Sequence, residues 1–201
     1  MAASKKLQKM QKMLNKEKVT AVYQPVISLT DGDLLGYESL MKIHTEEWRL
    51  YTDEMIQMAD SNEEVWEADA LYRKKSLEQV AGNLKGAKLF LNVDAHMMRN
   101  IKSRDSETIK YMGEYGINPE DLIFELTEQM VLQDAEGYGR IIRYYQQKGF
   151  QIVISRFSGN TRHLEKVCGM EPDFIKLDKC CIRNINSEKN KQNWLAKTME
   201  Y

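Results

Sequence analysis

Residues 121–157, DLIFELTEQMVLQDAEGYGRIIRYYQQKGFQIVISRF, contain the pattern that decides the fold. Two short apolar runs, at 121–126 and 150–155, flank a longer polar stretch at 134–148 that has helical spacing. A strand, a helix and a strand in this order predict two parallel strands joined by a crossover helix. Because both runs are almost continuously apolar, we expect a sheet that is buried on both faces.

The same alternation continues outward in both directions. The further elements expected are strands at 88–93 and 173–177, and helices at about 104–115, 161–169 and 187–201. Helical periodicity between residues 52 and 80 predicts two more helices, with a break at Ser61 and Asn62.

A hairpin is expected where the domain begins. Apolar runs at 21–29 and 34–43 are separated by residues 30–33, Thr-Asp-Gly-Asp, and Asp-Gly between two such runs is a strong hairpin signal. Residues 1–18 are expected to form a lead-in helix or linker, followed by one domain over 19–201. A complete (β/α)8 barrel typically needs ~250 residues, so about six strands predict either an open α/β sheet or a shortened barrel.

The composition argues against several classes of protein. The chain has 201 residues, and 29 Lys and Arg against 30 Asp and Glu give a net charge of −1, so nucleic acid is not an expected partner. No run approaches the ~20 apolar residues of a membrane span, and the lysine-rich start is unlike a secretory signal. We therefore expect a cytoplasmic protein that does not bind membranes.

The cysteines and histidines show no metal or disulfide pattern. The three cysteines are an odd number without the spacing of a zinc site, so reduced thiols are expected at Cys168, Cys180 and Cys181. Solvated or loop histidines are expected at His44, His96 and His163.

Four polar side chains lie late in the apolar strands, at Glu38, Asn92, Glu125 and Lys176. Parallel α/β folds build their active sites at these carboxyl ends. Two carboxylates and a carboxamide at one edge favour Mg²⁺ or Mn²⁺. Any one of these residues alone is better explained as a cap on a loop, but four in phase favour a site.

From about Tyr23 onward the chain resembles the EAL domain family, which hydrolyses the bacterial second messenger cyclic di-GMP. The matching segments, with ESL in place of EAL, are YQPVISLTDGDLLGYESLMKI, LFLNVD, LIFELTEQ, GFQIVISRFSGN and PDFIKLDKCCIRNI. The resemblance implies an α/β fold, a modified (β/α)8 TIM-type barrel with an antiparallel first strand, here incomplete and short at its C-terminal end. It also implies a two-metal phosphodiesterase that produces linear pGpG.

The resemblance implies roles for individual residues. Glu38, Asn92 and Glu125 match the ligands of the first metal ion, and Lys176 matches the active-site lysine.

Three further positions match residues outside the metal ligands. Glu128 matches a glutamate that steadies the neighbouring loop, and Gln24 matches a ligand-contacting position. Lys42 replaces an arginine, which keeps the positive charge but loses bidentate phosphate geometry.

One departure decides the functional interpretation. Ser155 and Arg156 occupy the positions of two acids, one of which bridges both metals in the family. At an effective dielectric constant of ~20, a unit positive charge ~4 Å from Mg²⁺ costs about 8 kcal/mol. We therefore expect Mg²⁺, Mn²⁺ or Ca²⁺ to bind weakly at most. Arg156 is expected either to pair with Glu38 or Glu125 in place of a metal ion or to point to solvent.

Three functions remain open. The leading hypothesis is a degenerate, catalytically inactive EAL-like domain that regulates cyclic di-GMP signalling through nucleotide binding or protein contact. The alternatives are an active metal-dependent phosphodiesterase and an interaction module that no longer binds the nucleotide. The exposed edges of an open barrel predict a homo-oligomer or a partner domain.

Overall fold

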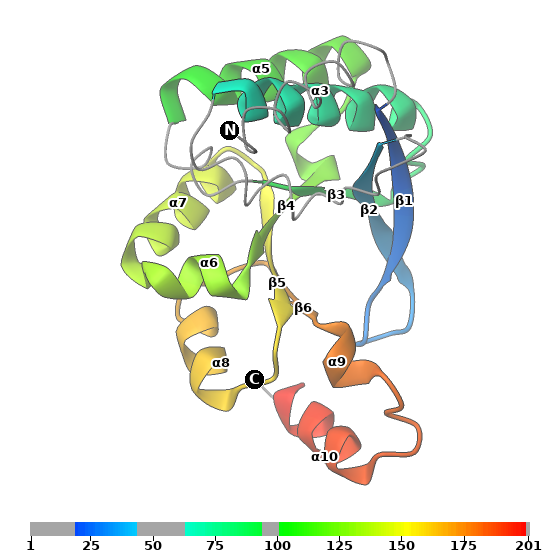
Figure 1. Cartoon of the computed structure of the whole chain (residues 1–201), viewed down its shortest axis with the longest axis vertical. Helices are drawn as coiled ribbons and strands as arrows, with labels where there is room; N and C mark the ends of the chain where they lie inside the picture. The colour runs from blue at the N-terminus through cyan, green and yellow to red at the C-terminus, as the bar shows by residue number, and fades with distance from the viewer. Residues whose placement is uncertain (1–18, 44–62, 94–100, 200–201) are drawn as a thin grey trace, which may run out of the picture. The chain divides into compact units, whose positions relative to one another are not determined.

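The computed structural model describes residues 19–43, 63–93 and 101–199. The elements in chain order are β1 (Val19–Ile27), β2 (Leu34–Ile43), α3 (Glu63–Val80), β3 (Lys88–Asn92), α5 (Ile101–Tyr115), the 3-10 helix η2 (Pro119–Asp121), β4 (Leu122–Thr127), α6 (Glu128–Gln133), α7 (Ala135–Gln147), β5 (Gln151–Phe157), α8 (Thr161–Cys168), β6 (Phe174–Leu177), α9 (Lys179–Ile182) and α10 (Lys189–Thr198) (Figure 1). The expected alternation of strands and helices is confirmed. The expected lead-in helix and the first of the two helices expected after residue 52 fall outside the described residues.

The strand order is β1-β2-β3-β4-β5-β6. β1 is antiparallel to β2, whereas the pairs β2 with β3 and β5 with β6 are parallel. The predicted α/β fold, with its antiparallel first strand and six strands, is therefore confirmed. The chain divides into two compact units, residues 1–123 and 124–201, which are described separately below.

In the first unit, the hairpin turns where Asp-Gly predicts it. Gly32 has φ +80°, a left-handed conformation that glycine adopts without steric cost. Its backbone N–H donates to the carbonyl of Ser28 at 3.0 Å. The resulting register places Gln24 opposite Glu38.

β2 approaches β3 closely at Gly36. Gly36 pairs with Lys88, and a Cβ atom on Gly36 would lie 2.1 Å from the Lys88 carbonyl oxygen. Any other residue at this position would force the two backbones apart. Gly36 therefore fixes the strand pair on which Glu38 and Asn92 lie.

A buried polar network attaches α3 to the hairpin. The Tyr23 hydroxyl donates to the carbonyl of Ser76 at 3.0 Å, and the hydroxyls of Ser39 and Ser76 lie 2.8 Å apart. The Tyr72 hydroxyl donates to the carbonyl of Ser39. Burial raises the pKa of Tyr23 to about 12, so that its hydroxyl remains a donor at neutral pH.

In the second unit, an aromatic cluster packs on the strands. The ring of Phe124 lies 4.8 Å from that of Phe150 and 5.4 Å from that of Tyr145. β5 continues to Phe157, so the prediction that it ends at Ser155 was wrong. The register with β6 shifts within this extension, where a bulge adds length to the strand.

Two short helices escaped the sequence prediction. α6 begins after Thr127, whose side chain accepts a hydrogen bond from the Met130 backbone N–H at 3.3 Å. α9 begins after Asp178, whose carboxylate accepts from the Cys180 N–H at 2.8 Å. Both caps follow a strand directly, so each helix starts where its strand ends.

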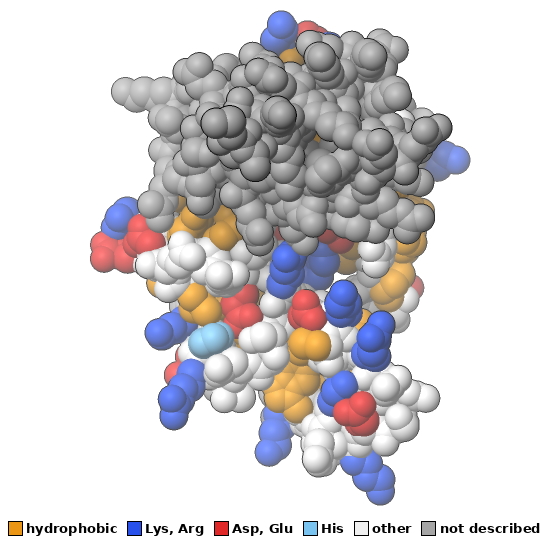
Figure 2. Space-filling model, viewed as in Figure 1, with side chains coloured by type: hydrophobic (Ala, Val, Ile, Leu, Met, Phe, Trp, Pro, Cys, Tyr) orange, Lys and Arg blue, Asp and Glu red, His pale blue; other side chains and the backbone are white. Residues whose placement is uncertain are grey.

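The described surface is mixed in character. On the face drawn in Figure 2, basic side chains are interspersed with acidic and uncharged ones, in keeping with the net charge of −1. Within the described stretches, the helices are too short or too polar to cross a membrane.

Candidate functional site

The first unit brings together three residues predicted for the site. The Asn92 amide donates to Glu38 Oε1 at 3.1 Å. Gln24 lies opposite Glu38 across the hairpin, and partners in an antiparallel pair project to the same face. Asn92 is buried, Glu38 is half-buried and Gln24 is exposed. Lys42 lies further along β2, opposite Thr20.

The second unit brings together Glu125 on β4 and Lys176 on β6. The Lys176 ammonium lies 2.8 Å from Oε1 and 2.7 Å from Oε2 of Glu125. The Glu125 side chain is 3% exposed and that of Lys176 is 25% exposed. A buried carboxylate requires such a partner, and the ammonium provides it.

Ser155 and Arg156 lie on the bulge of β5. The Ser155 side chain is buried, and its hydroxyl donates to the carbonyl of Leu126 at 3.3 Å. Arg156 is exposed and has φ +54°, a left-handed conformation that is unfavourable for a residue with a Cβ atom. The pairing of Arg156 with Glu38 or Glu125 stays a prediction.

Positive charge gathers around Asp178, just after β6. The pKa of the Asp178 carboxyl is lowered from its ordinary value, mainly because it accepts a hydrogen bond from the Cys180 N–H. The charges of Lys179 and Arg156 contribute to the same shift.

The donor set of the second unit does not fit a pair of divalent ions. The ammonium of Lys176 contacts both oxygens of Glu125, and positions 155 and 156 supply a hydroxyl and a guanidinium rather than carboxylate ligands. Among the described side chains, no three His, Cys, Asp or Glu gather as a metal centre. Divalent ions of this class require several oxygen ligands, and a pair requires shared ones. The oxygen donors of Glu38 and Asn92 in the first unit fit one ion at most.

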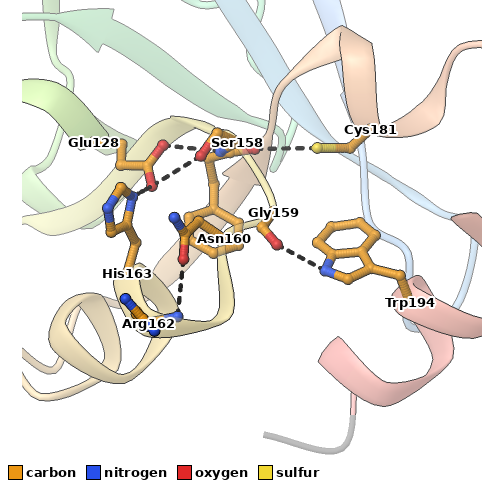
Figure 3. Close-up of polar contacts among 9 residues, drawn as sticks. Glu128, Ser158, Gly159, Asn160, Arg162, His163, Cys181 and Trp194 are labelled. Carbon is orange, nitrogen blue, oxygen red and sulfur yellow. Dashed lines mark hydrogen bonds and ion pairs between the residues drawn. The ribbon is translucent and has the colours of Figure 1, made fainter.

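Glu128 lies beside the loop that follows β5 (Figure 3). Its Oε2 accepts a hydrogen bond from the Ser158 N–H at 2.9 Å, and its Oε1 accepts from the Ser158 hydroxyl at 3.2 Å. His163 Nδ1 lies 2.7 Å from the same Oε1. His163 lies on α8 rather than in a loop, and its side chain is 37% exposed, so it is partly solvated as predicted while also contacting a buried acid.

Sequence reasoning missed the partners of this loop. Ser158 and His163 follow Glu128 by 30 and 35 residues, so no local spacing connects them. Trp194 is a further missed residue, and its indole N–H donates to the carbonyl of Gly159 at 2.9 Å. A tryptophan within a polar helix was the one available signal. His44 and His96 lie outside the described residues.

All three cysteines carry free thiols, as predicted. Cys181 is buried, and its thiol donates to the carbonyl of Phe157 at 3.4 Å. Burial is the main cause that raises the pKa of Cys181 to about 11. The Cys180 sulfur lies 4.0 Å away. Cys181 is therefore a structural thiol that supports the end of β5.

Comparison with known proteins identifies relatives along most of the chain. A sequence model described as EAL domain matches residues 7–200. The chain is 22% identical over 170 residues to the uncharacterized EAL-domain containing protein YkuI of Bacillus subtilis, covering 83% of this chain and 41% of the relative. It is 25% identical over 182 residues to the probable cyclic di-GMP phosphodiesterase PdeB of Escherichia coli, covering 87% of this chain and 34% of the relative. The chain thus spans less than half the length of these curated relatives.

Solved structures with the same fold carry little sequence identity. The PaMucR phosphodiesterase in complex with c-di-GMP has a TM-score of 0.77 at 17% identity, covering 93% of this chain and 77% of that chain. The Xanthomonas citri FimX EAL domain in complex with c-diGMP has a TM-score of 0.79 at 14% identity, covering 98% and 78%. These likenesses confirm the predicted barrel-type α/β fold. Because the family match extends over nearly all residues, this chain belongs to the EAL domain family.

Proposed function

We propose that this chain is a non-hydrolysing EAL domain that binds cyclic di-GMP and regulates signalling in the bacterial cytoplasm. The observation that carries the proposal is the pair Ser155 and Arg156, at positions where the resemblance implies metal-binding acids. The Ser155 hydroxyl donates to a backbone carbonyl of β4. The guanidinium of Arg156 adds a positive charge where two dications are expected, which opposes their binding.

Nucleotide binding does not require the missing acids. A guanidinium pairs with phosphate through charge-assisted hydrogen bonds, so Arg156 offers a counter-charge of the kind that a metal ion otherwise provides. Gln24 is exposed beside Glu38 and is available to a ligand. Two solved relatives of this fold are described as complexes with cyclic di-GMP, which further supports nucleotide binding here.

Two measurements on the same samples test the proposal. Calorimetric titration with cyclic di-GMP, once in EDTA and once in Mn²⁺, measures binding. The titrated mixtures are then assayed for pGpG, which measures hydrolysis. We expect micromolar binding in both buffers and no pGpG. Arg156→Ala is expected to weaken binding about tenfold, the effect of losing a charge-assisted hydrogen bond. Arg162→Ala, an exposed arginine on α8, serves as the matched control and leaves the affinity unchanged.

The outcomes separate the three functional classes. Metal-dependent pGpG would identify an active phosphodiesterase. A titration without binding heat in either buffer would identify an interaction module that has lost the nucleotide.

We also propose that a second copy or a partner domain covers the ends of the sheet. Among the described strands, β1 and β6 end the strand order, and end strands present unpaired backbone groups. Ile27 and Leu34 at the hairpin tip are 51% and 45% exposed. Light scattering that finds only monomer at micromolar concentration would contradict pairing between copies.

A further inference from the structure

The loop of residues 158–160 is held first from the side of α6. Glu128, 6% exposed, accepts hydrogen bonds from both the backbone N–H and the hydroxyl of Ser158. His163 Nδ1 lies 2.7 Å from Glu128 Oε1. Because the acceptor is a buried carboxylate, these bonds are stronger than those between neutral groups.

The same loop is held from the opposite side by α10 (Figure 3). The Trp194 indole N–H donates to the carbonyl of Gly159 at 2.9 Å. Gly159 has φ +85°, and a Cβ atom there would lie 2.8 Å from Trp194 Cζ2. The indole therefore packs directly against the α-carbon of Gly159, in space that any other residue would fill.

α10 depends on contacts of this kind for its position. None of its ten residues is buried. Lys191 and Gln192 donate to the carbonyls of Arg183 and Ile185, both at 2.7 Å, and these belong to the turn just before the helix. A helix of this length is marginal on its own, and elements with few buried contacts open first.

Glu128 and Trp194 form hydrogen bonds with adjacent residues of a short loop. Glu128 holds the N–H of Ser158, and Trp194 holds the carbonyl of Gly159. The loop then ends at Asn160, whose side chain caps α8 by accepting from the Arg162 N–H at 3.0 Å. With both ends fixed, a displacement at Gly159 changes the geometry at Ser158.

We propose that α10 acts as a latch: it holds the 158–160 loop through the contact of Trp194 with Gly159 and can detach from it. This contact is coupled to the hydrogen bonds between Glu128 and Ser158, called the Glu128 anchor below. Release of the helix frees the loop directly after the β5 bulge that carries Arg156. Since coupling between two equilibria is reciprocal, loosening the Glu128 anchor must in turn loosen α10.

Amide hydrogen exchange on the full chain tests the forward direction. In Trp194→Phe, which keeps an aromatic ring but loses the N–H donor, exchange of the 157–162 segment is expected to accelerate about fivefold, the effect of one hydrogen bond. Trp194→Ala should accelerate it further. Asn193→Ser, a change of similar helix propensity at an exposed neighbour on α10, is the control and leaves the loop unchanged. Unchanged loop exchange in both tryptophan variants would overturn the latch.

The reciprocal direction distinguishes a latch from a simple local contact. Glu128→Gln and the milder Ser158→Ala are each expected to accelerate exchange in residues 189–198, with β5 unaffected. Acceleration confined to the loop, or spread equally through β5, would overturn the proposed coupling.

Discussion

The ammonium of Lys176 lies within 2.8 Å of both carboxylate oxygens of Glu125. This ion pair joins β4 to β6 and places a covalently attached cation on the acid that the resemblance assigns to a metal ion. A divalent ion would have to displace the ammonium and then find further acidic ligands. The described residues of this unit do not supply them.

Removal of the ammonium should destabilise the fold. Lys176→Met leaves a buried carboxylate without its cation, and we expect a loss of about 2 to 3 kcal/mol in unfolding free energy, near the lower limit for buried pairs because Lys176 is partly exposed. Urea denaturation measures the loss. Lys166→Met, at an exposed position on α8, is the control, and the double variant Glu125→Gln/Lys176→Met should recover much of the stability. Equal stability of Lys176→Met and wild type would refute a stabilising pair.

Ser39 on β2 and Ser76 on α3 form a hydrogen-bonded pair, and replacing one of them by alanine should cost more stability than replacing the other. The Ser76 hydroxyl donates to the Tyr72 carbonyl at 2.8 Å, so the Ser39 hydroxyl must donate to Ser76. Ser76→Ala removes both the donor to the Tyr72 carbonyl and the hydroxyl that pairs with Ser39, and should cost about 1 to 3 kcal/mol, whereas Ser39→Ala should cost only about 0.5 to 1 kcal/mol. Thermal unfolding of both single variants and of the double variant measures which substitution costs more stability. A larger loss for Ser39→Ala would contradict this assignment of donors.

The left-handed backbone at Arg156 should favour glycine. Arg156→Gly and Arg156→Ala both remove the guanidinium, so their difference isolates the effect of the φ of +54°. We expect the glycine variant to be more stable than the alanine variant by about 1 kcal/mol, measured by urea denaturation. Equal stabilities would mean that this position is not strained.

The cap of α9 should depend on pH. The pKa of the Asp178 carboxyl lies below its ordinary value of 3.8 in the folded state, so the folded protein binds this proton less readily than the unfolded chain. Its stabilisation is complete above the ordinary pKa and is lost as the pH falls through the lowered folded value.

At pH 7, Asp178→Ala should therefore cost about 1 kcal/mol, the usual effect of losing an N-cap. In urea denaturation at pH 7, 5 and 3, the difference from wild type is expected to shrink at pH 3. Asp178→Asn, which keeps a cap acceptor without the charge, is the control. A difference that stays constant across this range would contradict a role for the charge.

Continuous apolar runs made most of the fold predictable from sequence. Each predicted strand in the second half lies within two residues of the observed one at either end, because few other structures bury such runs. The largest difference is at the end of β5, where Arg156 interrupts the apolar run although the strand continues through a bulge to Phe157. The helices α6 and α9 are too short to show a helical pattern of apolar residues. Their only sequence signals are the capping residues Thr127 and Asp178.

The sequence predicted which residues belong to the candidate site, but it did not predict which of them touch each other. Late positions in the strands singled out Glu125 and Lys176, since strand ends share an edge of the sheet. Lys176 and Glu125 are 51 residues apart in the sequence, and they meet because of the order of the strands in the sheet. A sequence pattern does not reveal which side chains of different strands touch. The contact of His163 with Glu128 escaped for the same reason.

The most direct test of the central claim is product formation at high protein concentration. Wild type is incubated for hours with cyclic di-GMP and Mn²⁺, and pGpG is quantified by chromatography against a protein-free control. We predict no pGpG above that control. Metal-dependent pGpG from wild type that disappears in Glu125→Gln would contradict the claim, because it would show that this site hydrolyses the nucleotide without the acids at positions 155 and 156.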